Sequence, residues 1–327
     1  MKISVLGSGP LGIGLSINFS KNDSIDQVLI YSRKSEIISQ INHDHRCIFD
    51  DIELSSKICA TGDLFFAIDS SDIIFITVNS SGLLNFLLEI TALKGNFDLS
   101  KKFFIICTKG IDREGFFSDI AKKILGTDGI AFLFGPSFAH EIACGERTFV
   151  NLIYHDLDYA SNIINQIVCN ETNVKLFPII DYIGAQVCSV MKNICAIYLG
   201  MAKGFGIKND RIAVMFKFFV DEMLKVINFY KGDEKTIFEF CGIGDLFLTC
   251  TSFESRNCNF GYQVGLTKNV DLAYQACNNY YPEGYYSLKN LIEMNKKSNL
   301  KLTICEKIYK VLFIDKCLHE NKDIFEL

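Results

Sequence analysis

Residues 2–16 read KISVLGSGPLGIGLS, a short apolar run followed by a glycine-rich turn and a helical pattern. The run predicts a buried strand and the last part a helix beginning near Leu11. Between them, Gly7 permits a tight turn, Gly9 lets the backbone approach a pyrophosphate, and Gly12 lets the helix pack against the strand. This order of strand, GxGxxG turn and helix is typical of dinucleotide-binding sites. A glycine turn that only joins two elements is the alternative.

The first 180 residues continue to alternate short apolar runs with helical stretches. Continuous runs such as IIFITV at 73–78 suit strands covered on both faces, as in a mostly parallel sheet. The predicted strands are 2–6, 27–31, 73–78, 103–108, 130–134 and 148–154, with 173–177 as a weaker edge. Residues 1–180 are therefore predicted to form an α/β domain with a Rossmann-like doubly wound sheet.

The strand-like runs end near Ile179, and the remaining sequence is helical. Within 210–231, apolar residues recur at three- and four-residue spacing, as on one face of a helix. Pro178 lies at the change of pattern, and proline is rare inside regular elements. We place the domain boundary there and predict an all-α C-terminal domain over residues 181–327.

Composition limits the class of protein. A chain of 327 residues with 49% hydrophobic residues suits two globular domains, and a net charge of −5 without a basic run gives no reason to expect a nucleic-acid partner. The 13 cysteines are odd in number and include no CxxC pair, and the five histidines show no metal-ligand spacing. We expect reduced thiols in a cytoplasmic protein, no signal peptide because a strand begins at residue 2, and no metal site.

Lys192 is the strongest single signal in the sequence. It is the only charged residue in the 21 residues of 182–202, a stretch long enough to span a membrane. A mid-span lysine costs about 2.5–3.5 kcal/mol on insertion, so a buried helix in a protein without integral membrane association is the better interpretation. Burial lowers a lysine pKa toward the range useful for acid–base catalysis. A lysine that reaches the surface is the alternative.

Other polar groups follow predicted strands. Ser32-Arg33-Lys34 stands after the second strand, where NAD-specific enzymes place an acid, which favours NADP; two solvated cations are the alternative. Lys109 and the Gly135-Pro136-Ser137 turn follow later strands at the edge where ligands of such sheets bind; a solvated lysine and a simple turn are the alternatives. The segment 242–257, GIGDLFLTCTSFESRN, holds Arg256, which suits a phosphate, although a capped loop explains it equally well.

Together these segments resemble the NAD(P)-dependent glycerol-3-phosphate dehydrogenase family of the bacterial type. The matching motifs are GSGPLG at 7–12, CTKGI at 107–111, GPSFAHE at 135–141, MKN at 191–193, the run 242–257 and PEG at 282–284. The resemblance implies a Rossmann domain and a helical domain like that of 6-phosphogluconate dehydrogenase, in a homodimer. It also implies reduction of dihydroxyacetone phosphate to sn-glycerol 3-phosphate, for phospholipid synthesis, with NADH or NADPH.

The resemblance also assigns roles to residues. Lys192 is similar to the family's proton donor, with Asp245 and Asn193 expected to orient its ammonium group. The implied substrate contacts are Lys109, Gly135, Ser137, Ser255, Arg256 and Asn257. The implied coenzyme contacts are Gly7, Gly9, Pro10, Leu11, Gly12, Arg33, Lys109, Ala139, Arg256 and Glu283.

Two other functions remain open from the sequence. One is a related two-domain dehydrogenase acting on a non-phosphorylated hydroxy acid or a ketopantoate-like substrate. The other is a nucleotide-binding sensor without catalysis, because a fold does not dictate a function.

Overall fold

The computed structural model describes residues 1–93, 95, 98–296, 298, 300–318 and 322–325. The chain divides into two compact units. Unit 1 comprises residues 1–108 and 118–182, and unit 2 comprises residues 109–117 and 183–327. The short segment 109–117 therefore groups with unit 2, although it lies between strands of unit 1 in the sequence.

Unit 1 is built on one eight-stranded sheet in the order β3-β2-β1-β4-β5-β6-β7-β8. β1 pairs in parallel with both β2 and β4, so the chain crosses to opposite sides of β1, and ligands of open α/β sheets bind at such a switch point. β7 runs antiparallel to β6. The strands are β1 (Lys2–Leu6), β2 (Gln27–Tyr31), β3 (Ile58–Thr61), β4 (Ile73–Ile76), β5 (Phe103–Ile106), β6 (Ile130–Phe134), β7 (Thr148–Ile153) and β8 (Val174–Ile179).

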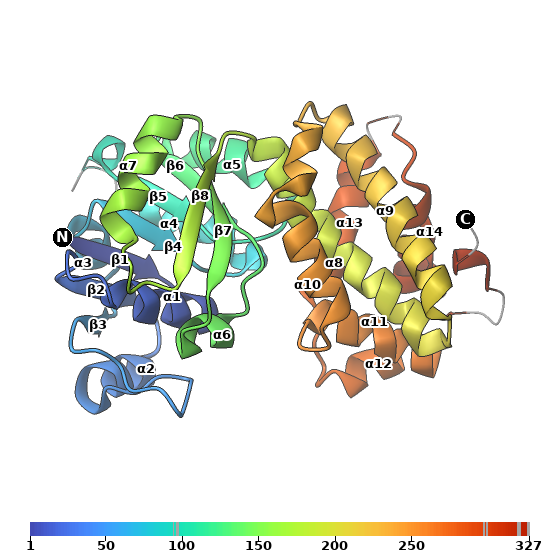
Figure 1. The fold of residues 1–327 in the computed structure, drawn as a ribbon, viewed down its shortest axis with the longest axis horizontal. Helices are drawn as coiled ribbons and strands as arrows, with labels where there is room; N and C mark the ends of the chain where they lie inside the picture. Colours follow the sequence, from blue (N-terminus) through green and yellow to red (C-terminus); the bar gives the residue numbers. More distant parts are fainter. Residues whose placement is uncertain (94, 96–97, 297, 299, 319–321, 326–327) are drawn as a thin grey trace. The chain divides into compact units, whose positions relative to one another are not determined.

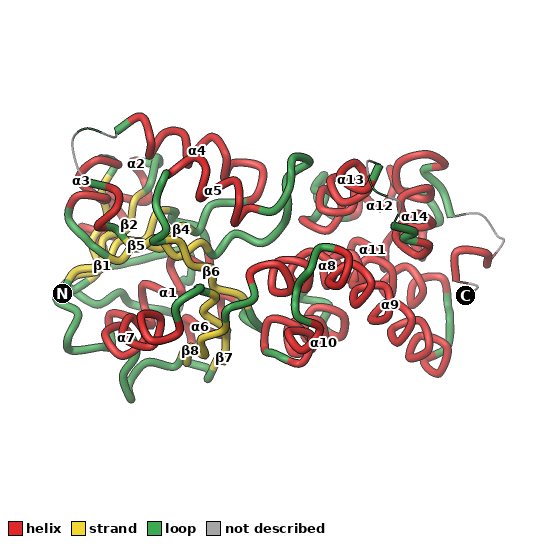
Figure 2. Tube along the Cα trace, turned by 90° about the horizontal axis from the view of Figure 1, so that it is seen from above, coloured by secondary structure: helices red, strands yellow, loops and turns green. Residues whose placement is uncertain are grey.

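Helices cover both faces of this sheet, which is the doubly wound arrangement predicted from the sequence. Figure 2 shows α4 and α5 on one face and α1 and α7 on the other. The helices of this part of the chain are α1 (Pro10–Ser20), α2 (Ser35–Ser39), α3 (Leu64–Asp69), α4 (Ser80–Ala92), α5 (Phe117–Leu125), α6 (Ala139–Cys144) and α7 (Leu157–Ile167). Central strands such as β4 and β5 are buried along their whole length, as their apolar runs predict.

Besides the shifted ends of β4, β5, β7 and β8, two details of unit 1 differ from the sequence prediction. β3 was not predicted, because Ile58–Thr61 is only four residues long and alternates buried with half-buried side chains. Pro178 does not mark the end of regular structure but lies inside β8, opposite Leu152 of β7. β8 is the last strand of the sheet, and an edge strand tolerates a residue without an N–H group.

Unit 2 is helical, and every strand in the described residues lies in unit 1. Figure 1 shows its helices in yellow-green to red. They are α8 (Tyr182–Phe205), α9 (Asn209–Phe229), α10 (Asp245–Thr251), α11 (Arg256–Thr267), α12 (Val270–Ala276), α13 (Glu283–Asn295) and α14 (Thr303–Tyr309). The predicted amphipathic face of α9 is present, since Ile212, Phe219 and Met223 are buried.

α8 is the core helix of unit 2. Every residue from Gly184 to Ala202 is buried. By length and composition α8 is the one candidate membrane span among the described residues, and 94% of its most apolar window is buried inside the protein. Its apolar surface is thus covered by the rest of the protein. The turn Lys322–Phe325 is part of this cover, because the Tyr198 hydroxyl donates to the Ile324 carbonyl oxygen at 3.2 Å.

α8 and α11 approach each other through glycines. A Cβ atom on Gly204 of α8 would lie 2.1 Å from the Tyr262 carbonyl oxygen, and one on Gly261 of α11 would lie 2.1 Å from the Ile197 carbonyl oxygen. No larger side chain fits at either position without moving a backbone. This close contact fixes the distance between the helices that carry Lys192 and Arg256.

Candidate active site

The Lys192 side chain lies inside unit 2 and points to two partners on α10. The residue is 4% exposed. Its Nζ atom donates to Asp245 Oδ1 at 2.5 Å and to Thr249 Oγ1 at 3.0 Å. Asp245 and Thr249 are one helical turn apart, so α10 presents both oxygens to the same ammonium group.

Burial controls the protonation of Lys192. Desolvation lowers the pKa of Lys192 from its ordinary value of 10.5 to about 7. Asp245 opposes this shift and raises the pKa, while the nearby positive charge of Lys109 lowers it further. An amine with a pKa near neutrality can both give and accept a proton at physiological pH.

Lys109 reaches the same carboxylate from a different part of the chain. Its Nζ atom donates to Asp245 Oδ2 at 2.9 Å, and its side chain is 20% exposed. The segment that follows is anchored in unit 2, because Ile111 and Phe116 are buried in its core and Asn290 Nδ2 donates to the Ile111 carbonyl oxygen at 2.8 Å. Asp245 therefore sits between two ammonium groups, which leaves a net positive charge.

A series of hydrogen bonds between amide groups starts at Asn193, the residue after Lys192. Asn257 Nδ2 donates to Asn193 Oδ1 at 3.0 Å, and Asn257 Oδ1 accepts from the Gly284 N–H group at 2.8 Å. Asn193 Nδ2 donates to the Ser189 carbonyl oxygen at 3.3 Å. Asn193 was expected to orient the Lys192 ammonium group, but its described hydrogen bonds instead join α8 to the start of α11. The hydrogen bond from Gly284 to Asn257 also fixes the start of α13, where Glu283 is the first residue.

Ser255 and Arg256 form the first turn of α11. Ser255 is the N-cap, and its Oγ atom accepts from the Cys258 N–H group at 3.3 Å. Arg256 is exposed, and its guanidinium group lies 5.3 Å from the centre of the Tyr280 ring. The arginine is thus an exposed cation at this helix end, whereas Ser255 and Asn257 already bond within the protein.

The glycine-rich turn of unit 1 connects β1 to α1. Gly7 has a φ angle of +133°, which disfavours other residues, and a Cβ atom on Gly12 would lie 2.1 Å from the Gly7 carbonyl oxygen. Gly9 is the N-cap of α1 and Pro10 its first residue, followed by half-buried Leu11. A Cβ atom on Gly9 would meet nothing within 4 Å. The turn therefore presents an open helix N-terminus, which suits an anion.

The turn after β2 carries no carboxylate. Ser32 Oγ lies 2.8 Å from Ser8 Oγ of the glycine-rich turn, which connects the two loops. Arg33 is exposed and makes an ion pair with Glu89 at 2.8 Å. Arg33 thus has an anionic partner in this structure.

Three further predicted residues follow β6. Gly135 is required by packing, because a Cβ atom there would lie 2.8 Å from the Val150 Cα atom. Ser137 Oγ donates to the Gly135 carbonyl oxygen at 3.0 Å. Ala139 begins α6, and its carbonyl oxygen lies against Gly14 of α1, where a Cβ atom would approach it to 2.8 Å.

The predicted residues thus fall into groups. Unit 2 brings Lys109, Lys192 and Asp245 into one cluster, and joins Asn193 to Asn257. Unit 1 holds the residues of the glycine-rich turn, Arg33 and the turn after β6. Thr249, the second partner of Lys192, was missed, although its position four residues after Asp245 on a predicted helix is a signal that could have found it.

Comparisons with known proteins identify the family. Residues 2–160 match the N-terminal part, and residues 181–321 the C-terminal part, of NAD-dependent glycerol-3-phosphate dehydrogenase. The chain is 31% identical to a glycerol-3-phosphate dehydrogenase [NAD(P)+] from Phytoplasma australiense, over 96% of this chain and 94% of the relative. It is 30% identical to one from Tolumonas auensis, over 95% and 92%.

Solved structures show the same fold. Glycerol-3-phosphate dehydrogenase from Coxiella burnetii superimposes with a TM-score of 0.87 at 22% identity, covering 99% of this chain and 97% of that chain. The enzyme from Saccharomyces cerevisiae gives a TM-score of 0.84 at 21% identity, covering 100% and 99%. Since the sequence matches extend through both units, the chain belongs to the NAD-dependent glycerol-3-phosphate dehydrogenase family.

Proposed function

We propose that this chain catalyses the reversible, NAD(P)H-dependent reduction of dihydroxyacetone phosphate to sn-glycerol 3-phosphate, which supplies phospholipid synthesis. Family membership supports the reaction class. The observation that carries the mechanism is the buried Lys192 ammonium group, held by Asp245 and Thr249 with a pKa lowered to about 7. A carbonyl reduction needs such a proton donor, because the oxygen becomes an alkoxide as hydride arrives.

A reduced nicotinamide coenzyme, when bound, would supply the hydride that the carbonyl carbon needs. Lys192 gives a proton from Nζ to the carbonyl oxygen, and the product is a secondary alcohol. Asp245 and Thr249 hold the ammonium group in one orientation. Lys109 adds a second positive charge, which stabilises the negative charge on the oxygen before the proton is transferred. In the reverse reaction Lys192, as a neutral amine, accepts the proton from the alcohol.

Arg256 is the proposed phosphate anchor, with Ser255 and Asn257 alongside it. The exposed guanidinium group suits bidentate contact with phosphate oxygens. Gly135, Ser137 and Lys109 are proposed as further substrate contacts, with the coenzyme at the glycine-rich turn, Ala139 and Glu283. Binding a remote phosphate can orient the carbonyl, so loss of Arg256 is expected to lower kcat as well as raise KM.

The test is coenzyme oxidation by the purified protein, with dihydroxyacetone phosphate or unphosphorylated dihydroxyacetone as substrate. Lys192→Ala should lower kcat by about 10²- to 10⁴-fold, the usual contribution of a general acid. Lys203→Ala, on the same helix, is the matched control, because Lys203 Nζ donates only to the Cys250 carbonyl oxygen among its described hydrogen bonds. Near-normal turnover in folded Lys192→Ala would remove the mechanism, and equal activity on the two substrates would favour the non-phosphorylated alternative.

The coenzyme preference is proposed to be NADPH over NADH. Support comes from the absence of an acid in the turn Ser32-Arg33-Lys34, and from Arg33, which can exchange Glu89 for a 2′-phosphate. Arg33→Ala should raise the KM for NADPH about tenfold, because a hydrogen bond to a charged group contributes about 1.5 kcal/mol.

Glu89→Gln sharpens this test, because it releases Arg33 without removing it. The variant should lower the KM for NADPH and leave that for NADH unchanged. Initial rates with the two reduced coenzymes give both constants. If Arg33→Ala raises the two KM values equally, the preference is not set at this residue.

A cytoplasmic homodimer completes the proposal. The resemblance to the family supports the dimer, and the high content of reduced cysteines supports the cytoplasm. Sedimentation of the purified protein at assay concentrations should give twice the mass of the monomer.

A further inference from the structure

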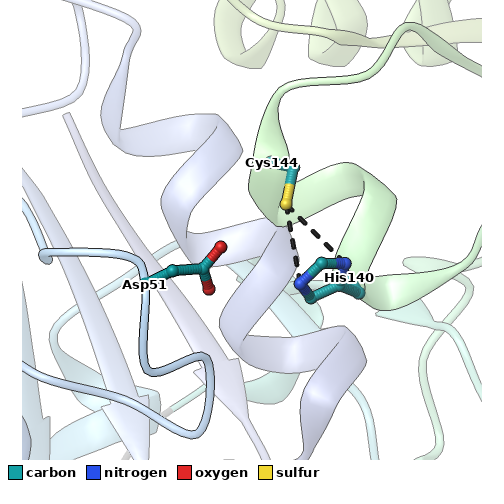
Figure 3. Close-up of side chains that lie close together, drawn as sticks. All are labelled: Asp51, His140 and Cys144. Carbon is teal, nitrogen blue, oxygen red and sulfur yellow. Dashed lines mark hydrogen bonds between the residues drawn. The ribbon is translucent and has the colours of Figure 1, made fainter.

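A second group of metal-ligating side chains lies in unit 1, outside the proposed catalytic cluster. Asp51, His140 and Cys144 each offer a ligand atom, and these atoms all lie within 4.8 Å of one another. Figure 3 shows the Asp51 carboxylate facing the His140 ring and the Cys144 thiol. We propose that these three residues form a binding site for Zn²⁺, a site that the dehydrogenase reaction does not require.

Two of the ligands are held by one helix. His140 and Cys144 are four residues apart on α6, so their side chains lie on the same face. The Cys144 Sγ atom is 3.7 Å from both His140 ring nitrogens, Nδ1 and Nε2. In a tetrahedral zinc site with bonds of about 2.3 Å to sulfur and about 2.0 Å to nitrogen, those two ligand atoms are about 3.5 Å apart. Because Sγ is equally far from both nitrogens, it lies off the lone-pair direction of each, so binding the ion requires rotation of the His140 or Cys144 side chain but no movement of α6.

The third ligand comes from a separate loop that is packed against the same histidine. Phe49 is buried, and its ring meets the His140 ring edge to face at 5.4 Å between centres. The Ile52 N–H group donates to the Phe49 carbonyl oxygen at 3.1 Å, which closes a turn around Asp51. Asp51 is thus brought to His140 by a packed aromatic contact, although the two residues are distant in the sequence.

The chemistry of the ligands favours zinc over magnesium and calcium. One imidazole nitrogen, one thiolate and one carboxylate match the ligands of Zn²⁺, whereas Mg²⁺ and Ca²⁺ prefer oxygen alone. The thiolate and the carboxylate together carry two negative charges, which neutralise the ion. All three residues are exposed, so water can fill the fourth position. Such an open site is expected to bind Zn²⁺ reversibly.

The experiment uses the full-length, reduced and metal-free protein, titrated with Co²⁺ as a spectroscopic probe and then with Zn²⁺. The expected result is one thiolate-to-cobalt charge-transfer band that Zn²⁺ removes at one equivalent. Cys144→Ser should abolish the band. His140→Asn and Asp51→Asn should each weaken Zn²⁺ binding, measured by calorimetry, at least about tenfold.

Matched controls come from the same unit. Cys169→Ser and His43→Asn change a cysteine and a histidine outside the cluster, and they should keep both the band and the affinity. Circular dichroism verifies that each variant is folded, and Asp51→Asn, an exposed loop substitution, provides a readout that does not depend on α6. The proposal is overturned if Cys144→Ser keeps the band, or if Asp51→Asn and His140→Asn bind Zn²⁺ as tightly as the unmodified protein.

Discussion

At the scale of single residues, the site in unit 2 is governed by three charges. Lys192 and Lys109 both contact Asp245, so two positive charges share one negative charge in a place with little water. A buried ammonium group without a partner would lose its proton. One whose charge is fully balanced by a carboxylate would hold its proton too tightly to donate it. The combination of desolvation, one carboxylate and one competing ammonium group places the pKa of Lys192 at about 7, between these extremes.

The pH dependence of catalysis tests this balance. Reduction needs the protonated amine, so kcat should fall as the pH rises above about 7, whereas oxidation of glycerol 3-phosphate needs the neutral amine and should rise over the same range. Asp245→Asn removes the charge that raises the pKa of Lys192 and should move the midpoint to lower pH. Lys109→Met removes the charge that lowers this pKa and should move it to higher pH.

The midpoint of the profile is the readout, because both variants also lose turnover. Shifts in opposite directions are the outcome expected if both residues act on the proton of Lys192. Midpoints that move in the same direction, or not at all, would contradict the electrostatic account.

At the scale of elements, the contact between α8 and α11 positions the proposed catalytic and phosphate-binding groups. The glycines permit backbone contact along the helices, and the hydrogen bond from Asn257 to Asn193 continues it toward the site. The spacing of the two helices is therefore set by packing in the core of unit 2 rather than by the charged residues themselves.

A single methyl group should disturb this contact. Gly261→Ala gains about 1 kcal/mol of helix propensity, but its Cβ atom would lie 2.1 Å from the Ile197 carbonyl oxygen, and overpacking costs typically about 1–3 kcal/mol, more where a backbone must move. We expect a net loss of stability, seen as a lower midpoint in urea unfolding. Gly62→Ala is the control, because the nearest atom there, Ile38 Cδ1, would be at 3.4 Å. An unchanged midpoint in Gly261→Ala would show that the helices can separate without cost.

Some strands of unit 1 were predicted correctly from the sequence, and others were not. β1, β2 and β6 have the predicted bounds, because each is a short apolar run between turn signals. β3 was missed since its pattern is weak, and the antiparallel direction of β7 has no local signal. The grouping of 109–117 with unit 2 depends on where Ile111 and Phe116 become buried, which only tertiary packing decides.

In the site, the sequence likewise predicted which residues take part but not all of their contacts. The burial of Lys192 follows from its uncharged neighbours in the sequence, and the role of Asp245 came from the family resemblance. Neither source indicated that Asn193 would bond to Asn257 and Ser189, because an amide has several partners within reach and the packing of α11 selects among them. The zinc ligands were also missed, since Asp51 is far in sequence from the pair on α6.

At the scale of the whole molecule, buried groups make stability depend on pH in two opposite ways. The pKa of Lys192 is lowered by burial, so between about pH 7 and 10.5 the unfolded chain binds the extra proton and the free energy of unfolding rises with pH. Burial raises the pKa of Cys195, Cys241 and Cys305 well above the ordinary 9.0, so above that pH the folded chain binds more protons and the free energy of unfolding falls. Each group contributes at most about 1.4 kcal/mol per pH unit.

The pKa values of Cys47, Cys59, Cys258 and Cys277 are raised by burial as well, so the amine and the thiols together predict a stability maximum between about pH 8 and 9. From pH 7 to 8 the lysine dominates, and the free energy of unfolding should rise by about 1 kcal/mol; above pH 9 the thiols outweigh the one amine, and it should fall. Urea unfolding under reducing conditions across this range measures the curve. The double variant Lys192→Met/Asp245→Asn, which removes the buried ion pair, should lose the rise and keep the fall. If the unmodified protein shows no rise, the Lys192 amine does not titrate near neutrality, and the account of its lowered pKa is wrong.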